Sequence, residues 1–346
     1  MADRIFRNSQ LIHPSGMRIE TPMLIPSFSS KGFGISTKKL PGGEEVDHSE
    51  VATILEAASE FLTDSMLISA YDIYYQYIPM PENAKTDITV ADSGGYETSD
   101  LQDLSCTFIQ RLSCRDWDEE KHSEILAKWP EHIPAMFVSY DKANLRILLQ
   151  DQISRAIELF KAHRAHLSTI LVKPETRDQK DIQMENVIAH AERFGHFDVV
   201  GIAEKELEGS CLKRMEVIAK IRLALDDAGV KAPIHIFGSL DPISVPLYFL
   251  AGAEIFDGLT WLRFGYEDGC AMYRNNFAAK RRGVGIHRRD DFVKLKTMQD
   301  NLGFLTELTN QMRRFLIDTD YAKFGQNESI FREAFDLLKT RVRRVS

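Results

Sequence analysis

Three aspartates are the first candidates for chemistry in this sequence, because each follows a short apolar run of the kind that forms a buried strand. They are Asp92, Asp141 and Asp257. Carboxylates that converge in a partly dry pocket repel one another and lose hydration, so their pKa values separate. One carboxyl group can then hold a proton while another stays ionised, which suits nucleophilic and acid–base cleavage at an anomeric carbon.

Those apolar runs belong to a set of eight that alternates with amphipathic stretches. The predicted strands are 21–26, 66–70, 88–91, 135–139, 169–172, 199–202, 234–237 and 254–257, and the predicted helices are 50–62, 144–163, 181–194, 210–228 and 243–251. Eight such units indicate an α/β fold, a closed (β/α)8 TIM barrel whose strands end at one mouth. An open doubly wound sheet is the competing fold, but no GxGxxG motif follows an early strand.

The chain is predicted to divide into two parts. Residues 1–265 would form the catalytic barrel, with a charged insertion at about 100–132, and residues 266–346 a helical extension packed on it. The extension shows no clear strands and two helical runs, 297–316 and 328–342. Residues 271–346 carry 16 Lys and Arg against 9 Asp and Glu, although the whole chain has a net charge of −8. The basic residues of the extension could contact a polyanion. The ordinary alternative is that they form solvated faces of helices.

Composition excludes several classes of protein. A content of 44% hydrophobic and 27% charged residues is typical of a folded domain. No stretch approaches the ~18 apolar residues of a membrane span, and the first ten residues contain no signal-like apolar run, so we expect a cytoplasmic protein without membrane contact. The four cysteines are Cys106, Cys114, Cys211 and Cys270, and they form no CxxC pair. They are expected to be ordinary thiols.

Several short motifs, spread over most of the chain and in the same order, resemble those of the tRNA-guanine transglycosylase superfamily. The most specific is Asp92-Ser93-Gly94-Gly95-Tyr96, which is similar to the family signature DSGGF. The other similar segments are 20–26 (family TPvfmPv), 69–73 (NTYHL), 139–141 (FDEC), 201–206 (GGLAVGE), 237–242 (MGvGtPedl) and 256–263 (FDCVlPTR). Barrel enzymes of this family exchange a guanine in nucleic acid for a 7-deazaguanine base without breaking the backbone.

The resemblance implies a role for each matching residue. Asp257 would be the nucleophile that forms a covalent glycosyl intermediate, Asp92 the general acid and base, and Asp141 the acceptor for the N1/N2 edge of the base. The remaining predicted base-binding residues are Tyr96 and Phe237, which would sandwich the purine, Lys173, and the backbone of Gly201, Ile202 and Ala203. The predicted polynucleotide contacts are Arg263, Lys280, Arg281, Arg282, Arg288 and Arg289.

Each of these residues also has an ordinary structural interpretation. Asp92 could belong to a tight turn, and Asp141 could cap the helix expected after it. Tyr96 and Phe237 could be core aromatics, and Arg263 a surface residue. Only the order of the motifs favours the functional interpretation.

Departures from the family pattern indicate that the substrate has changed. The family's zinc site, CxCxxC and a histidine, is reduced here to Cys270 and His287, so we expect no metal and no cofactor. Lys173 stands in place of a glutamine, and since lysine only donates hydrogen bonds, recognition of the base edge must differ. Glu97 likewise replaces the glutamine that follows DSGGF.

The predicted function is therefore base exchange in a polynucleotide, with a 7-deazaguanine such as preQ0 or preQ1 as the incoming base. DNA is favoured over tRNA, because the zinc-supported element that contacts tRNA is missing. The alternatives are a tRNA-guanine transglycosylase proper, a nucleosidase or glycosidase acting on small deazapurine nucleosides, and a non-catalytic partner subunit. Association into a homodimer is also left open.

Overall fold

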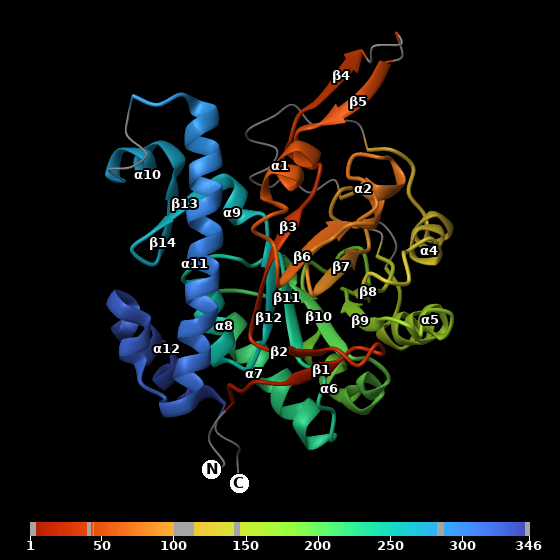
Figure 1. Cartoon of the computed structure of the whole chain (residues 1–346). Helices are drawn as coiled ribbons and strands as arrows, with labels where there is room; N and C mark the ends of the chain where they lie inside the picture. Colours follow the sequence, from red (N-terminus) through yellow and green to blue (C-terminus); the bar gives the residue numbers. More distant parts are fainter. Residues whose placement is uncertain are drawn as a thin grey trace.

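The core of the protein is a closed barrel of eight parallel strands, seen in a computed structural model that describes residues 5–39, 43, 45–99, 114–141, 146–281 and 287–342 (Figure 1). The strands in chain order are β3 (Met23–Phe28), β6 (Ser65–Ser69), β7 (Ile88–Asp92), β8 (Ala135–Val138), β9 (Leu167–Val172), β10 (Val199–Ala203), β11 (Ile234–Phe237) and β12 (Ile255–Gly258). Each pairs with the next, and β12 pairs with β3. The predicted (β/α)8 barrel is confirmed.

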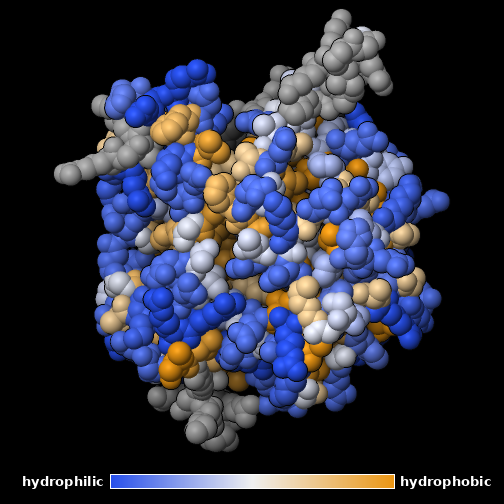
Figure 2. Space-filling model, in the orientation of Figure 1, coloured by the Kyte–Doolittle hydropathy of each residue, from blue (hydrophilic) through white to orange (hydrophobic). Residues whose placement is uncertain are grey.

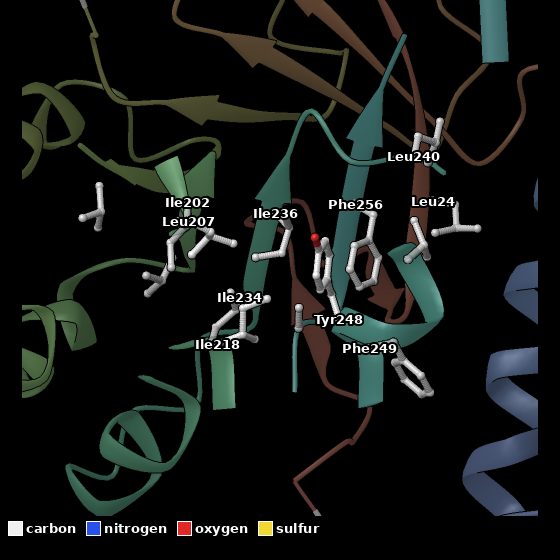
Figure 3. Packing of buried hydrophobic residues seen from close by; sticks show 14 of the residues in the cluster. Leu24, Ile202, Leu207, Ile218, Ile234, Ile236, Leu240, Tyr248, Phe249 and Phe256 are labelled. Carbon is white, nitrogen blue, oxygen red and sulfur yellow. The ribbon is translucent and has the colours of Figure 1, made fainter. Parts of the chain in front are cut away.

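The barrel strands are continuous apolar runs because both of their faces are covered. Along β3, Met23 and Ile25 pack with residues from the other strands, whereas Leu24 and Phe28 pack outward in the larger core that includes the helices. Figure 3 shows this outer layer, where Tyr248 of helix α8 (Ser244–Leu250) lies beside Phe256 of β12. The alternation fixes which residue of each strand faces the barrel interior.

Helices connect the strands as a parallel barrel requires. They are α1 (Glu50–Ala58), α2 (Ala70–Tyr74), α4 (Glu119–Ala127), α5 (Leu149–Lys161), α6 (Met184–Ala189) with the 3-10 helix η1 (Ala191–His196), α7 (Cys211–Asp227) after the 3-10 turn η2 (Glu204–Glu206), and α8. The predicted helix 181–194 is wrong as one element. His190 lies between its two parts, outside helical dihedrals, and its Nδ1 contacts the carbonyl of Asn186 at 2.9 Å.

The predicted insertion at about 100–132 needs correction, as far as the described residues go. Residues 100–113 lie outside them, but 119–127 form α4, the helix that connects β7 and β8. This helix buries His122, Ile125 and Leu126, and the neighbouring Trp117 is also buried. Its high charge misled the prediction, because only one narrow face of the helix is apolar.

Three β-hairpins were not predicted. They are β1 (Gln10–Ile12) with β2 (Arg18–Glu20), β4 (Ile35–Lys39) with β5 (Glu45–Ser49), and β13 (Phe264–Glu267) with β14 (Cys270–Tyr273). The last contradicts the expectation of no clear strands in the C-terminal extension, and the predicted boundary at 265 falls inside β13. Its turn, Asp268-Gly269, has positive φ at both residues, which is what a tight hairpin needs, and Asp-Gly is a strong hairpin signal.

The C-terminal extension is helical, as predicted, and packs along the side of the barrel (Figure 1). Its helices are α10 (Arg274–Lys280), the 29-residue α11 (Asp290–Asp318), η3 (Tyr321–Asn327) and α12 (Glu328–Arg341), and the short α9 (Thr260–Arg263) precedes it. Phe315 of α11 contacts Phe6 and Phe249, with ring centroids 5.1 Å and 6.4 Å apart. Buried Asn301 of α11 donates to the carbonyls of Trp261 and Phe264, which fixes the β13–β14 hairpin beside the barrel mouth.

The surface is mostly polar on the face that Figure 2 shows, where apolar side chains are scattered among hydrophilic ones. Large apolar residues are exposed singly, as at Ile317 of α11 and Phe61 after α1. Scattered apolar residues are normal on a protein surface. None of the helices in the described ranges is both long and apolar enough to cross a membrane.

Candidate active site

A cavity of about 610 Å³ lies at the carboxyl ends of the barrel strands. This volume is in the range of small-molecule sites. Every barrel strand, or the loop that follows it, contributes to the lining, and the contributors include Ser27, Leu67, Asp92, Asp141, Lys173, Ala203, Phe237 and Asp257. The three aspartates selected from the sequence therefore share one cavity, and they come from the third, fourth and eighth strands or from the residues just after them.

Asp257 is held by three hydrogen-bond donors. His235 Nε2 lies 3.0 Å from Oδ1, and the backbone N–H of Gly238 donates to the same oxygen at 3.2 Å. The hydroxyl of Ser27 donates to Oδ2 at 2.7 Å. Only 5% of Asp257 is exposed. These donors fix the carboxylate in one orientation at the floor of the cavity.

Asp92, at the end of β7, lies in a different electrostatic environment. Burial raises the pKa of Asp92 to about 7, and the nearby carboxylates of Glu97 and Asp257 add to the rise. A carboxyl group with a pKa near neutrality can both give up and accept a proton at physiological pH. Asp92 therefore has the property that a general acid and base needs.

Two more acids lie beside Asp92. Glu97 accepts hydrogen bonds from the hydroxyls of Ser29 and Ser69, the second at 2.9 Å. Asp72 is fully buried and accepts from the Ser30 backbone N–H at 2.7 Å, and burial holds its pKa well above the ordinary value. Within the described ranges, no Lys or Arg forms an ion pair with Asp72, Asp92 or Glu97, which we name the unpaired acids.

Two further acids are paired with cations. Lys173 Nζ lies 3.0 Å from Asp141 Oδ2 and 2.8 Å from Glu206 Oε1, and Arg146 approaches the same carboxylates at 3.5 Å and 3.7 Å. Burial opposes the charge on Lys173, but the two carboxylates outweigh it and raise its pKa. We name Asp141 and Glu206 the paired acids. The contacts of Asp141 replace the helix-capping role considered from the sequence, since α5 begins at Leu149 with Leu148 at its N-cap.

The two predicted stacking residues, Tyr96 and Phe237, both line the cavity. The Tyr96 ring has the Lys31 ammonium 4.4 Å from its centroid, and its hydroxyl accepts from Arg263 at 3.3 Å. Phe237 stacks on His235 with ring centroids 3.7 Å apart. Neither aromatic is an ordinary core residue, because each also faces the cavity.

Gly201 and Ile202 do not line this cavity, contrary to the prediction, whereas Ala203 does. Their segment is the middle of β10, paired with β9 and β11, so its backbone is used by the sheet. Ile202 packs outward and is fully buried. At Gly201 a Cβ would lie 2.5 Å from the Phe237 ring, so this glycine makes room for that ring.

Three of the six predicted polynucleotide contacts are exposed and already have acidic partners. Lys280 pairs with Asp268 and Arg281 with Glu267, both in the β13–β14 hairpin, and Arg289 pairs with Asp291. The Arg288 guanidinium lies over the Phe292 ring, 5.3 Å from its centroid. Arg282 lies outside the described residues. Exposed ion pairs are weak, so these side chains can exchange partners. Arg263 differs, because it lines the cavity.

Sequence reasoning missed His235 and Ser27, which hold Asp257. A signal for His235 was present, since it is the polar residue of the run Ile234-His235-Ile236-Phe237, two positions before an expected cavity residue and therefore on the same face of the strand. It also missed Arg146 and its contacts with the paired acids. The spacing of these residues in the sequence did not indicate the two contacts of Arg146.

The described residues contain no group of three or more His, Cys, Asp and Glu side chains suited to hold a metal ion. No protein-family model matches the chain, and no curated protein matches its sequence. The fold and the cavity define the class: a (β/α)8 barrel with a cavity at its mouth that is lined by both acidic and basic side chains.

Proposed function

We propose that this protein is a base-exchange transglycosylase, which replaces guanine in a polynucleotide by a 7-deazaguanine base. The observation that carries the proposal is the contrast between Asp257 and Asp92 in one cavity. Asp257 is held rigidly by three donors, as a nucleophile must be, whereas the pKa of Asp92 is raised to about 7, as acid–base catalysis requires. The resemblance of the motifs around both aspartates supplies the kind of reaction.

In the first step, an oxygen of Asp257 attacks C1′ of the target nucleotide. The C1′–N9 bond breaks, its electron pair stays with guanine, and protonated Asp92 gives its proton to the departing base. In the second step, Asp92 takes the proton of the incoming base, whose nitrogen attacks C1′ and frees the Asp257 carboxylate. After both steps Asp92 is protonated again and the Asp257 carboxylate is free, so the exchange needs no cofactor. The polynucleotide backbone stays intact.

The cavity supports a purine-sized ligand with at least one hydrogen-bond acceptor. Lys173 is buried beside the cavity with a charged ammonium that can only donate. A base carbonyl is a suitable partner for it. Asp141 already binds Lys173, so it shares its acceptor capacity between this lysine and the donor edge of a base.

Among polynucleotides, we favour DNA over tRNA. In the region where the related tRNA enzymes bind zinc, this chain has the β13–β14 hairpin and α10. A guanine within a duplex would have to be extruded to enter the cavity, at a cost of a few kcal/mol. Arg263, at the rim of the cavity, is suited to hold the phosphate or ribose of an extruded nucleotide.

The test offers radiolabelled guanine to the protein with DNA and with tRNA and measures which one takes up label. We expect uptake into DNA, and a covalent protein–DNA adduct after denaturing electrophoresis that is lost in Asp257→Ala. Asp178→Ala, an exposed residue, is the matched control. Adduct formation by Asp257→Ala would remove Asp257 as the nucleophile. Turnover of free nucleosides with inert polynucleotides would favour a nucleosidase instead.

A further inference from the structure

We infer that His235 is a positioning residue that makes Oδ2 of Asp257 the attacking oxygen and supports Oδ1 when the sugar is released. This inference rests on the proposed function. His235 is two positions before Phe237 on β11, and its Nε2 lies 3.0 Å from Asp257 Oδ1. The imidazole is completely buried and stacked on Phe237.

The three donors around Asp257 are divided unequally between its two oxygens. Among the described residues, Oδ1 receives the Gly238 N–H and faces His235 Nε2, whereas Oδ2 receives only the Ser27 hydroxyl. Hydrogen bonds to an oxygen withdraw its electron density and occupy its lone pairs. Oδ2 therefore keeps more free lone-pair capacity, and it is the better nucleophile of the two.

The same division assists the second half of the reaction. In the intermediate, Oδ2 is bonded to C1′ and Oδ1 is the carbonyl oxygen of the ester. When the incoming base attacks C1′, the electron pair of the C1′–Oδ2 bond returns to the carboxylate, and negative charge develops on both oxygens. Donors already aimed at Oδ1 stabilise that charge without reorganising. Loss of the His235 donor should therefore slow release of the intermediate.

The energetics of burial favour this role over simple packing. His235 Nδ1 is buried and has no hydrogen-bond partner among the residues described. An unpaired buried polar atom destabilises the folded protein, and an apolar side chain of similar size would avoid this cost. The contact with Asp257 is thus the feature of His235 that an apolar residue could not supply.

The test compares His235→Gln with His235→Met, which have similar shapes and differ in the donor. Single-turnover experiments with labelled polynucleotide measure formation and decay of the covalent adduct. We expect His235→Met to slow adduct decay roughly 10- to 100-fold, with KM for the polynucleotide changed less than about twofold, and His235→Gln to restore most of the rate. Decay at the wild-type rate in His235→Met, or equally slow decay in both variants, would overturn the inference.

A second measurement uses the wild-type protein, so it does not depend on how the variants fold. 15N NMR of the histidine-labelled wild type should show the Nε2–H tautomer for His235. The Nδ1–H tautomer would disprove the hydrogen bond to Oδ1. If the wild type forms no adduct with any polynucleotide, the proposed function fails and the release role fails with it. The tautomer then still decides the contact between the two side chains.

Discussion

Two sets of carboxylates share the barrel mouth in contrasting environments. The paired acids, Asp141 and Glu206, are bridged by Lys173 at 3.0 Å and 2.8 Å. The unpaired acids are buried among serine hydroxyls, and the pKa of Asp92 there is raised to about 7. The difference shows how one cavity can separate two tasks. Cations keep the paired acids charged and fixed, whereas burial without a cation partner among the described residues raises the pKa of Asp92.

The largest expected effect comes from removing the nearer cation of the paired acids. Lys173→Met leaves Asp141 and Glu206 buried with only the longer contacts to Arg146, at 3.5 Å and 3.7 Å, among the described residues, and breaking such a pair costs roughly 3–5 kcal/mol of unfolding free energy. Urea denaturation at pH 7 measures the loss. Lys205→Met is the control, because Lys205 lines the same cavity without an ion pair to any described residue, and it should cost under ~1 kcal/mol. Equal losses of unfolding free energy in both variants would show that the ion pairs of Lys173 do not distinguish the paired acids from the unpaired acids.

Asp92→Asn should stabilise the protein at alkaline pH. The folded-state pKa of Asp92, about 7, lies above the ordinary value of 3.8, so the folded protein keeps a proton that the unfolded chain has lost. The stability from this group is complete below about pH 4 and is lost as pH rises through about 7. At pH 8 the variant should therefore gain up to about 4 kcal/mol. Asp178→Asn should show no such gain, and an unchanged pH dependence in Asp92→Asn would contradict the raised pKa.

Glu97→Gln should shift the pH dependence of the reaction. Glu97 is the charged neighbour that contributes most to the raised pKa of Asp92, so its neutralisation should lower that pKa by about one unit. Adduct formation needs protonated Asp92, and its alkaline limb should move from about pH 7 toward pH 6. The exposed Glu208→Gln serves as control. An alkaline limb that stays in place would show that Glu97 does not tune Asp92.

The smallest effect is expected outside the cavity. Replacing Lys280 and Arg281 by alanine should weaken polynucleotide binding a few-fold and reduce the slope of log Kd against log salt by about 1–2. The matched control replaces Arg332 and Lys339 of α12, which lies at the other end of α11 from α10 (Figure 1). A slope that changes equally in both double variants would remove the specific role of the extension.

The barrel could be predicted because each of its strands is a short apolar run that can be recognised in the local sequence. The runs at 88–91 and 234–237 are apolar and short, and the structure has strands at Ile88–Asp92 and Ile234–Phe237. Positions of the three aspartates followed, since parallel strands bring their carboxyl ends to one mouth. Motif order added Tyr96, Lys173 and Phe237, all of which line the cavity.

The contacts of those residues could not be predicted. Ser27 and Asp257 are 230 positions apart and meet only because β3 and β12 close the barrel. Lys173 could be recognised as a departure from a glutamine, but nothing local indicated that it bridges Asp141 and Glu206. The incorrect prediction that the Gly201 backbone binds the base has a similar origin. Gly201 lies in a strand that pairs with a neighbour on each side, so its backbone is used by the sheet and does not line the cavity.

The sequence by itself determined the strands, the mouth they share and the acids that stand there, since these depend on local hydrophobicity and on strand polarity. Tertiary structure alone decided which acid pairs with a cation and which acid has a raised pKa. It also decided which oxygen of Asp257 has fewer hydrogen-bond partners. Protonation and hydrogen bonding depend on burial and on neighbours a few ångströms away. Those neighbours come from strands that meet only when the barrel closes.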